Sequence, residues 1–277
     1  MLPRLLAAGW QVVAIARRPA TDPIPRGVMR VAADLAGDAW QQWCEGCTVA
    51  ISLAGIAREN PATGSTFDRV HRLAVERLLA ACHSRGITRV VHVSAAGARS
   101  DATTPRLRSK ASGEALVRSS ALTWTIVRPT VIFGPGDRFF TSLARRLSDA
   151  GPFVVFGDGA FLLQPVSAED VADAVVRSLD CVEAERASFD LGGPETVSYN
   201  ELVQRTASAL AVTRAITHFS LSLPRTVLSV TQRLTHPHLM LAQLAEATAG
   251  ATCDSSRTRE VLGVPQVRYL GPTWLSG

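Results

Sequence analysis

Lysine is almost absent from this 277-residue sequence, although basic residues are common. Lys110 is the single lysine among 29 basic residues, and the other 28 are arginines. So strong a bias is typical of an unusual genome base composition. A position that keeps lysine against this bias is therefore a candidate functional residue.

Cysteine is scarce, and its spacing excludes a disulfide scaffold. The five cysteines form no even, regular framework in a chain of this length, which favours a reducing compartment. Cys44 and Cys47 form a C-x-x-C motif, yet no second pair or nearby histidine completes a zinc site. We interpret them as small apolar residues that lead into a strand, and we expect no metal site.

Long apolar runs and clustered charges are also missing. No uncharged apolar run approaches the ~18 residues of a membrane span, and no run of four cations suggests a nucleic-acid tail. The formal charge of +5 with 47% hydrophobic residues fits a mildly basic globular protein that favours anionic ligands over nucleic acid. The N-terminus mimics a secretory signal, but Gly9 and Gln11 interrupt its apolar stretch and Arg17-Arg18 follow it. We therefore expect a cytoplasmic protein.

Apolar periodicity alternates between strands and helices through the first half of the chain. Short β-branched runs predict strands at 11–16, 28–32, 48–53, 89–94 and 123–127. Periodic apolar positions predict helices at 2–8, 39–44, 67–84 and 109–119, and Gly86 is expected to stop the third of them. This order predicts an α/β fold with a doubly wound, parallel Rossmann-type sheet that helices cover on both faces.

The sequence changes in character after Arg128, where glycine and proline begin to punctuate shorter elements. No long polar linker separates the two parts. We therefore assign residues 1–128 to an NAD(P)-binding domain and residues 129–277 to a smaller C-terminal α/β lobe interwoven with the end of the sheet.

Two helices are expected in that lobe. Ser167 and Asp170 have the spacing of a capping box before an apolar helix over 171–179. The amphipathic stretch 223–249 is expected to pack on the protein's own core. Docking onto a partner protein or a membrane surface is the alternative for this stretch.

Residues directly after each predicted strand are the candidate ligand contacts, because doubly wound sheets bind ligands at the carboxyl ends of their strands. Arg17 and Arg18 follow the first strand, where NAD-binding proteins usually offer an acid to the ribose. Arginine there suits a 2′-phosphate and favours NADP(H) over NAD(H). Two solvated arginines in an arginine-rich chain are the alternative.

The later strand ends add further candidates. Asp34 and Leu35 follow the second strand, and Asp34 either contacts the adenine or caps the next helix. Leu53, Ala54 and Gly55 follow the third strand, where small residues let a dinucleotide approach the backbone.

Ser94 ends the fourth predicted strand, and Lys110 lies on the helix before the fifth. Ser94 is either a site residue or a cap at the strand end. His71 and His92 are expected to fill or flank the core rather than bind metal. Arg128 and Arg138 are candidates for contact with a small anionic substrate.

Three spaced motifs give the chain a family resemblance. They are R-S-K-A-x-G-E at 108–114, T-x-V-R-P at 125–129 and F-G-P-G-D at 133–137. In this order they resemble the extended and atypical short-chain dehydrogenase/reductase superfamily. Segments 134–140, 164–172 and 191–202 are similar to the branch that contains the NADPH-binding accessory subunit of respiratory complex I and its bacterial relatives.

The resemblance implies specific roles for several residues. Lys110 matches the lysine that binds the nicotinamide ribose, and Ser94 matches the serine after the fourth strand. Pro129 and Thr130 are implied as further cofactor contacts. Arg106 stands where the superfamily has its catalytic tyrosine, and arginine stays protonated, so it cannot replace that acid/base.

The superfamily also opens with a strand and a G-x-x-G-x-x-G loop that this sequence lacks. That strand lies in the middle of a 3-2-1-4-5 sheet, so we expect two unpaired strand edges and an open apolar slot. Two explanations stay open: a start codon assigned too far downstream, or a truncated, nonfunctional product.

The sequence therefore predicts an NADP(H)-binding protein that lacks the catalytic tyrosine, in which the nucleotide is structural or sensory. One alternative is an active NAD(P)-dependent oxidoreductase or epimerase whose proton donor is Ser94, a water or the substrate. The other is an assembly or interaction module for a membrane-associated respiratory complex, which would place the protein at the inner membrane face.

Overall fold

The computed structural model describes residues 1–17, 25–219, 252–266, 268 and 270. The chain divides into two units, each built from separated segments. The first unit comprises residues 1–129, 169–191 and 254–265, and the second comprises residues 130–168, 192–253 and 266–277. The helix expected over 223–249 lies outside the described residues.

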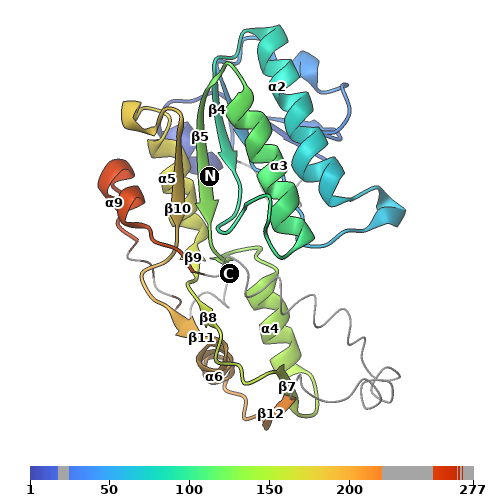
Figure 1. The fold of residues 1–277 in the computed structure, drawn as a ribbon, viewed down its shortest axis with the longest axis vertical. Coiled ribbons are helices and arrows are strands. Elements are labelled where there is room, and N and C mark those ends of the chain that lie inside the picture. The colour runs from blue at the N-terminus through green and yellow to red at the C-terminus, as the bar shows by residue number, and fades with distance from the viewer. Residues whose placement is uncertain (18–24, 220–251, 267, 269, 271–277) are drawn as a thin grey trace. The chain divides into compact units, whose positions relative to one another are not determined.

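All paired strands described in the first unit are parallel. Strands β1 (Val12–Ala16) and β2 (Val28–Ala32) form one two-stranded sheet. A four-stranded sheet has the order β10-β5-β4-β3 and consists of β3 (Val49–Ser52), β4 (Arg89–Val93), β5 (Thr123–Pro129) and β10 (Ala187–Leu191) (Figure 1). The expected α/β fold of the Rossmann type is confirmed.

Helices connect these strands. They are α1 (Leu2–Ala7), η1 (Gln41–Cys44), η2 (Pro61–Thr63), η3 (Asp68–Leu73), α2 (Ala74–Arg85), α3 (Pro105–Ser119), α5 (Ala168–Arg177), η4 (Val182–Ala184) and α9 (Ser256–Leu262). The expected stop at Gly86 is confirmed, because this residue caps α2 with a φ of 70° that suits glycine.

Helix α3 begins four residues earlier than its apolar pattern predicted. The Thr104 hydroxyl accepts a hydrogen bond from the Leu107 amide at 3.3 Å, and Pro105 occupies the first turn. Threonine before proline is a standard helix start, since the proline needs no amide partner there. The early start places Arg106 inside the helix.

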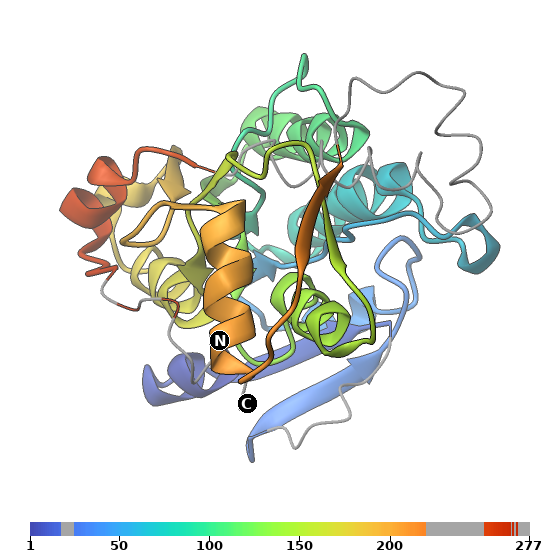
Figure 2. The same cartoon turned by 90° about the horizontal axis from the view of Figure 1, so that it is seen from below.

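The sheet of the first unit is interrupted between β1 and β3. Strand β1 pairs only with β2 (Figure 2, blue), and β3 pairs only with β4, so each has an edge that no described strand occupies. Side chains at these edges, such as Val13, Ile15 and Ile51, are only half-buried, whereas every residue of β4 is buried. The predicted pair of unpaired edges is confirmed.

One apolar core lies beneath this sheet. It brings together residues of η1, the strands, α2 and α3, with Ile15 and Leu35 packed at its margin. Its buried members are Trp40, Cys44, Ala50, Val75, Ala81, Cys82, Ile87, Val90, Val117, Trp124 and Ile126. Cys44 therefore has the apolar role that the sequence predicted for it.

The described residues of the second unit form short strand pairs and two helices. Its elements are β6 (Ile132–Phe133), α4 (Phe139–Ser148), β7 (Phe153–Phe156), β8 (Leu162–Leu163), β9 (Val166–Ser167), β11 (Val197–Ser198), α6 (Tyr199–Ala209) and β12 (Ile216–Phe219). Strands β6 and β9 pair in parallel, as do β7 and β12, whereas β8 and β11 are antiparallel.

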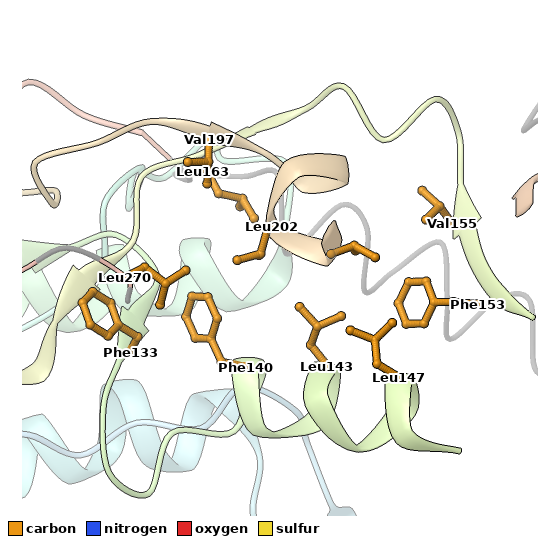
Figure 3. Packing of buried hydrophobic residues seen from close by; sticks show 11 residues of the cluster. Phe133, Phe140, Leu143, Leu147, Phe153, Val155, Leu163, Val197, Leu202 and Leu270 are labelled. Atoms are coloured by element: carbon orange, nitrogen blue, oxygen red, sulfur yellow. The ribbon is translucent and has the colours of Figure 1, made fainter. Parts of the chain in front are cut away.

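Helix α4 supplies much of the core of this unit. Phe140, Leu143 and Leu147 point from α4 toward Leu202 of α6 and toward the short strands (Figure 3). Asp137 accepts a hydrogen bond from the Phe140 amide at 2.8 Å and so supports the helix start. The G-P-G-D-R-F-F segment is therefore explained by helix capping and core packing.

Helix α3 packs so closely on η3 that only glycine fits at one contact. A Cβ atom built on Gly113 would lie 2.3 Å from the His71 carbonyl oxygen. The glycine of the R-S-K-A-x-G-E motif is thus required by backbone contact, although glycine ordinarily weakens a helix.

We predict that Gly113→Ala lowers the free energy of unfolding by about 1–3 kcal/mol, because the added methyl overpacks the contact with η3. In an exposed helix the same change would raise stability by up to about 1 kcal/mol. Urea denaturation measures the difference. Ser112→Ala, at the exposed neighbouring position of α3, is the control, and a gain in stability from Gly113→Ala would contradict the packing described.

Candidate functional site

Lys110 is buried at the carboxyl ends of two strands. Its side chain comes from α3, is only 7% exposed and donates hydrogen bonds to the carbonyl oxygens of Ala54 at 3.2 Å and Val93 at 3.1 Å. These carbonyls belong to the loop after β3 and to the last residue of β4. The single lysine of the chain therefore holds two strand ends together.

The surroundings of Lys110 weaken its charged form. The pKa of Lys110 is lowered from 10.5 to about 8. Burial is the main cause and the charge of Arg106 adds to it, whereas the charge of Glu114 opposes the shift. Space is also restricted, because a Cβ atom on Gly55 would lie 3.1 Å from Nζ. A compact ammonium group suits this position better than the broad guanidinium of arginine.

His71 joins the same loop to α3. Its Nε2 accepts a hydrogen bond from the Ile56 amide at 3.0 Å, so Nδ1 carries the proton and donates to the Ser109 hydroxyl at 2.7 Å. Ser109 in turn donates to the Arg106 carbonyl at 2.7 Å. The expectation that His71 fills the core missed these partners, which connect segments far apart in the sequence.

The environment of His71 favours its neutral form. His71 is only 1% exposed, and its pKa is lowered to about 3. Burial is the main cause, and the charges of Lys110, Arg106 and His92 add to it. Its hydrogen bond from Ile56 opposes the shift. At neutral pH the ring is therefore uncharged.

Two buried polar side chains of β4 and its end have no partner among the described residues. They are Ser94, whose hydroxyl oxygen is unpaired, and His92, whose two ring nitrogens are unpaired. Burial, followed by the charges of Lys110 and Arg118, lowers the pKa of His92 to about 3. Ser94 directly follows Val93, whose carbonyl binds Lys110, so its hydroxyl is placed at the same strand end.

Arg106 lies in the first turn of α3 and is half-buried. It reaches the site electrostatically, since its charge contributes to the lowered pKa values of Lys110 and His71. A guanidinium group does not release a proton near neutral pH. Arg106 therefore lowers the pKa values of its neighbours through its charge, and a guanidinium cannot act as an acid/base itself.

The ends of β1 and β2 are organised differently. Asp34 accepts hydrogen bonds from the Ala36 amide at 3.0 Å and from Arg69 at 2.7 Å, and the bond from Arg69 is the main cause of its lowered pKa. The hydrogen bond from the Ala36 amide forms an Asx turn. The alternative that Asp34 caps the next helix was wrong, because that helix begins only at Gln41. Arg17 is exposed directly after β1, and Arg18 lies outside the described residues.

The remaining predicted cofactor residues are spread over both units. Leu53 is 51% exposed, and Pro129 is buried with its carbonyl accepting the Ala96 amide at 2.9 Å. Thr130 belongs to the second unit, where its hydroxyl donates to the Gln164 carbonyl. Within the first unit, the structure therefore brings Ala54, Gly55 and Lys110 into direct contact.

Arg128 is not available for a substrate, contrary to expectation. Its guanidinium donates to both carboxylate oxygens of Glu114, at 2.8 and 2.6 Å, and Glu114 is completely buried. Arg118 donates to the same carboxylate at 2.8 Å. The hydrogen bond to Glu114 is the main cause of the raised pKa of Arg128. This pair joins α3 to β5, whereas Arg138 is exposed on the second unit.

The described part of the chain contains no three His, Cys, Asp or Glu side chains arranged to bind a metal ion. Burial raises the pKa of the Cys82 thiol to about 12, so the buried cysteines of the core are not poised as thiolates. No helix within the described ranges is both long and apolar enough to cross a membrane.

Comparison with known proteins gives the site a context. The family described as NAD(P)H-binding matches residues 1–181. The Arabidopsis thaliana protein named NADH dehydrogenase [ubiquinone] 1 alpha subcomplex subunit 9 is 32% identical over 158 residues, 56% of this chain and 39% of that protein. The Caulobacter vibrioides ceramide reductase is 33% identical over 132 residues, 47% of this chain and 41% of that protein. The chain thus spans about two fifths of these curated relatives.

Solved structures agree with the fold. MoeE5 in complex with UDP-glucuronic acid and NAD has a TM-score of 0.75 at 22% identity, over 99% of this chain and 93% of that one. The UDP-glucuronic acid 4-epimerase from Bacillus cereus, in complex with NAD, has a TM-score of 0.76 at 16% identity, over 99% and 91%. At these identities the likeness establishes a shared fold.

We predict that His92→Leu reduces the acid sensitivity of the protein. The ordinary pKa of histidine is 6.5, whereas burial lowers the pKa of folded His92 to about 3, so the unfolded chain binds more protons between these values. Stability is therefore lost as the pH falls from 6.5 toward 3, at up to about 1.4 kcal/mol per pH unit for each such histidine.

Denaturation by urea at several pH values between 4 and 7 measures this slope. The exposed His83 of α2 provides the matched control variant, His83→Leu. A slope for His92→Leu equal to that of the unaltered protein would contradict the prediction. The variant also removes two unpaired buried nitrogens, so we expect no loss of stability at pH 7.

Proposed function

Because this chain belongs to the NAD(P)H-binding family, as an atypical short-chain dehydrogenase/reductase related to a respiratory complex I subunit, we propose that it binds NADP(H) in a structural or sensory role. The observation that carries the proposal is the buried ammonium of Lys110 between the ends of β3 and β4. Ligands of doubly wound sheets bind at such strand ends.

The residues around Lys110 fit the ribose part of a dinucleotide. Gly55 leaves its backbone uncovered beside Nζ, and the unpaired hydroxyl of Ser94 lies at the neighbouring strand end. Lys110 would donate to a ribose hydroxyl, and Ser94 would supply a further hydrogen bond. When bound, a nicotinamide dinucleotide supplies hydride chemistry.

The absence of a suitable tyrosine favours a role without turnover. The chain has only Tyr199 and Tyr269, and neither lies in the segments of the first unit. Arg106 stands at the corresponding helix position, and a guanidinium cannot take the acid/base part of a phenol. An active oxidoreductase or epimerase is the second reading, and the unpaired hydroxyl of Ser94 is the observation that favours it as a non-standard proton donor.

The preference for NADP(H) over NAD(H) rests on the end of β1. Arg17 is exposed there, Arg18 follows in the sequence, and neither position offers the acid that usually binds the ribose hydroxyls of NAD. Arginine binds phosphate through several donors at once. A 2′-phosphate would therefore be favoured over a free hydroxyl.

We predict that the full natural protein binds NADPH more tightly than NADH, and that Lys110→Ala weakens NADPH binding about 10- to 150-fold, as expected for a lost charged hydrogen bond of about 1.5–3 kcal/mol. Calorimetric titration measures both constants, with Ser112→Ala on the same helix as control. Carbonyl compounds and nucleotide sugars are expected to give no turnover. Robust turnover that disappears in Lys110→Ala would establish the active reading instead.

A second candidate function is association with a membrane-bound respiratory complex. It is favoured by the sequence similarity to mitochondrial proteins that are named as subunits of NADH dehydrogenase. The protein would then lie peripherally at the inner membrane face and contribute a bound nucleotide to the assembly.

We predict for this candidate that the untagged protein sediments with detergent-solubilised membrane complexes and dissociates only partly at high salt. Immunoblots across a sucrose gradient of native membranes measure its position, with a cytoplasmic protein of similar mass as control. Recovery of the whole pool as free monomer or dimer would exclude the association.

A further inference from the structure

We propose that His71 is a positioning residue of the dinucleotide site and that it acts through Ser109. This inference rests on the proposed function, because the site it supports is the one around Lys110. The ring of His71 fastens the loop after β3, and Ser109 links the ring to the helix turn that carries Arg106 and Lys110.

The loop after β3 is held at two points from different helices. The Ala54 carbonyl accepts from Lys110 of α3, and two residues later the Ile56 amide donates to His71 of η3. Gly55 between these points has no side chain to hold it, and a Cβ there would meet Lys110 Nζ at 3.1 Å and His71 Nε2 at 3.8 Å. Both contacts together therefore set the path of the loop backbone.

The other side of the imidazole contacts α3. Nδ1 lies 2.7 Å from the Ser109 hydroxyl, which donates to the carbonyl of Arg106 one turn earlier. Ser109 directly precedes Lys110, so the hydrogen-bond chain ends on the helix segment that supplies the ammonium. The His71 carbonyl also faces Gly113 of the same helix.

The local backbone explains how one residue reaches both partners. His71 lies within η3, a π-helical segment over Asp68–Leu73 at the start of the long helix. Such wider turns are rare in proteins, and those that occur are often found at functional sites. A buried histidine with a partner on each ring nitrogen is more than a space-filling side chain.

The arrangement requires the neutral ring with its proton on Nδ1. Protonated Nε2 would be a donor facing the Ile56 donor, and the groups whose charges act on the ring are the cations Lys110 and Arg106 together with His92. Phenylalanine can fill the volume but can form neither hydrogen bond. His71→Phe therefore separates packing from positioning.

The test combines ligand-free and ligand-bound measurements on the full natural protein. We expect His71→Phe to speed amide exchange of Ile56 at least tenfold and to weaken NADPH binding about tenfold. Ser109→Ala is expected to produce smaller changes of the same sign, and Ser109→Thr, which keeps the hydroxyl, should restore the affinity. Ser112→Ala removes an exposed serine that also donates to a carbonyl of the preceding turn, and should change neither.

Nitrogen-15 shifts of the His71 ring provide a readout that packing alone would not move. We expect the signature of the Nδ1–H tautomer in the unaltered protein, and a changed Nδ1 shift in Ser109→Ala, where the Nδ1 proton loses its acceptor. The inference would be overturned if the His71→Phe and Ser109→Ala proteins fold and leave both the amide exchange of Ile56 and the NADPH affinity unchanged. Should the unaltered protein bind no dinucleotide, the proposed function fails, whereas Ile56 exchange and the ring shifts still decide whether His71 fastens the loop.

Discussion

The ammonium group of Lys110 is buried where two parallel strands end, and the surrounding structure depends on how that burial is stabilised. A charged group removed from water is costly unless polar atoms replace its hydration. The carbonyls of Ala54 and Val93 provide this replacement, while the lowered pKa shows that the compensation is incomplete. Helix α3 is consequently tied to the ends of β3 and β4, the edge at which doubly wound sheets bind ligands.

One short segment of α3 serves three separate contacts. Lys110 binds the loop after β3, Ser109 and Gly113 contact His71 of η3, and Glu114 binds Arg128 of β5 in a buried pair. Breaking a buried ion pair leaves an uncompensated charge, so these contacts hold the helix in one orientation. The R-S-K-A-x-G-E motif thus specifies placement of the helix as much as chemistry.

Arg106 changes what this placement can do. In a site with tyrosine, a lysine beside it lowers the pKa of the phenol; here a second cation lowers the pKa of the lysine. Under the proposed function, Lys110 and Ser94 hold a ribose, and Arg106 supplies no phenol that could move a proton. The strands of the first unit form two separate sheets, and no described strand occupies the free edges of β1 and β3. On either side of this interruption the strands are still paired, β1 with β2 and β3 with β4.

Local signals in the sequence by themselves determined the succession of strands and helices, the stop at Gly86 and the choice of Lys110, because β-branched runs, glycine caps and a single lysine can be recognised without partners. Only the tertiary structure decided the roles of His71, Asp34 and Arg128. Their partners lie far away in the chain, and a hydrogen bond between distant residues depends on folding geometry that no local pattern encodes.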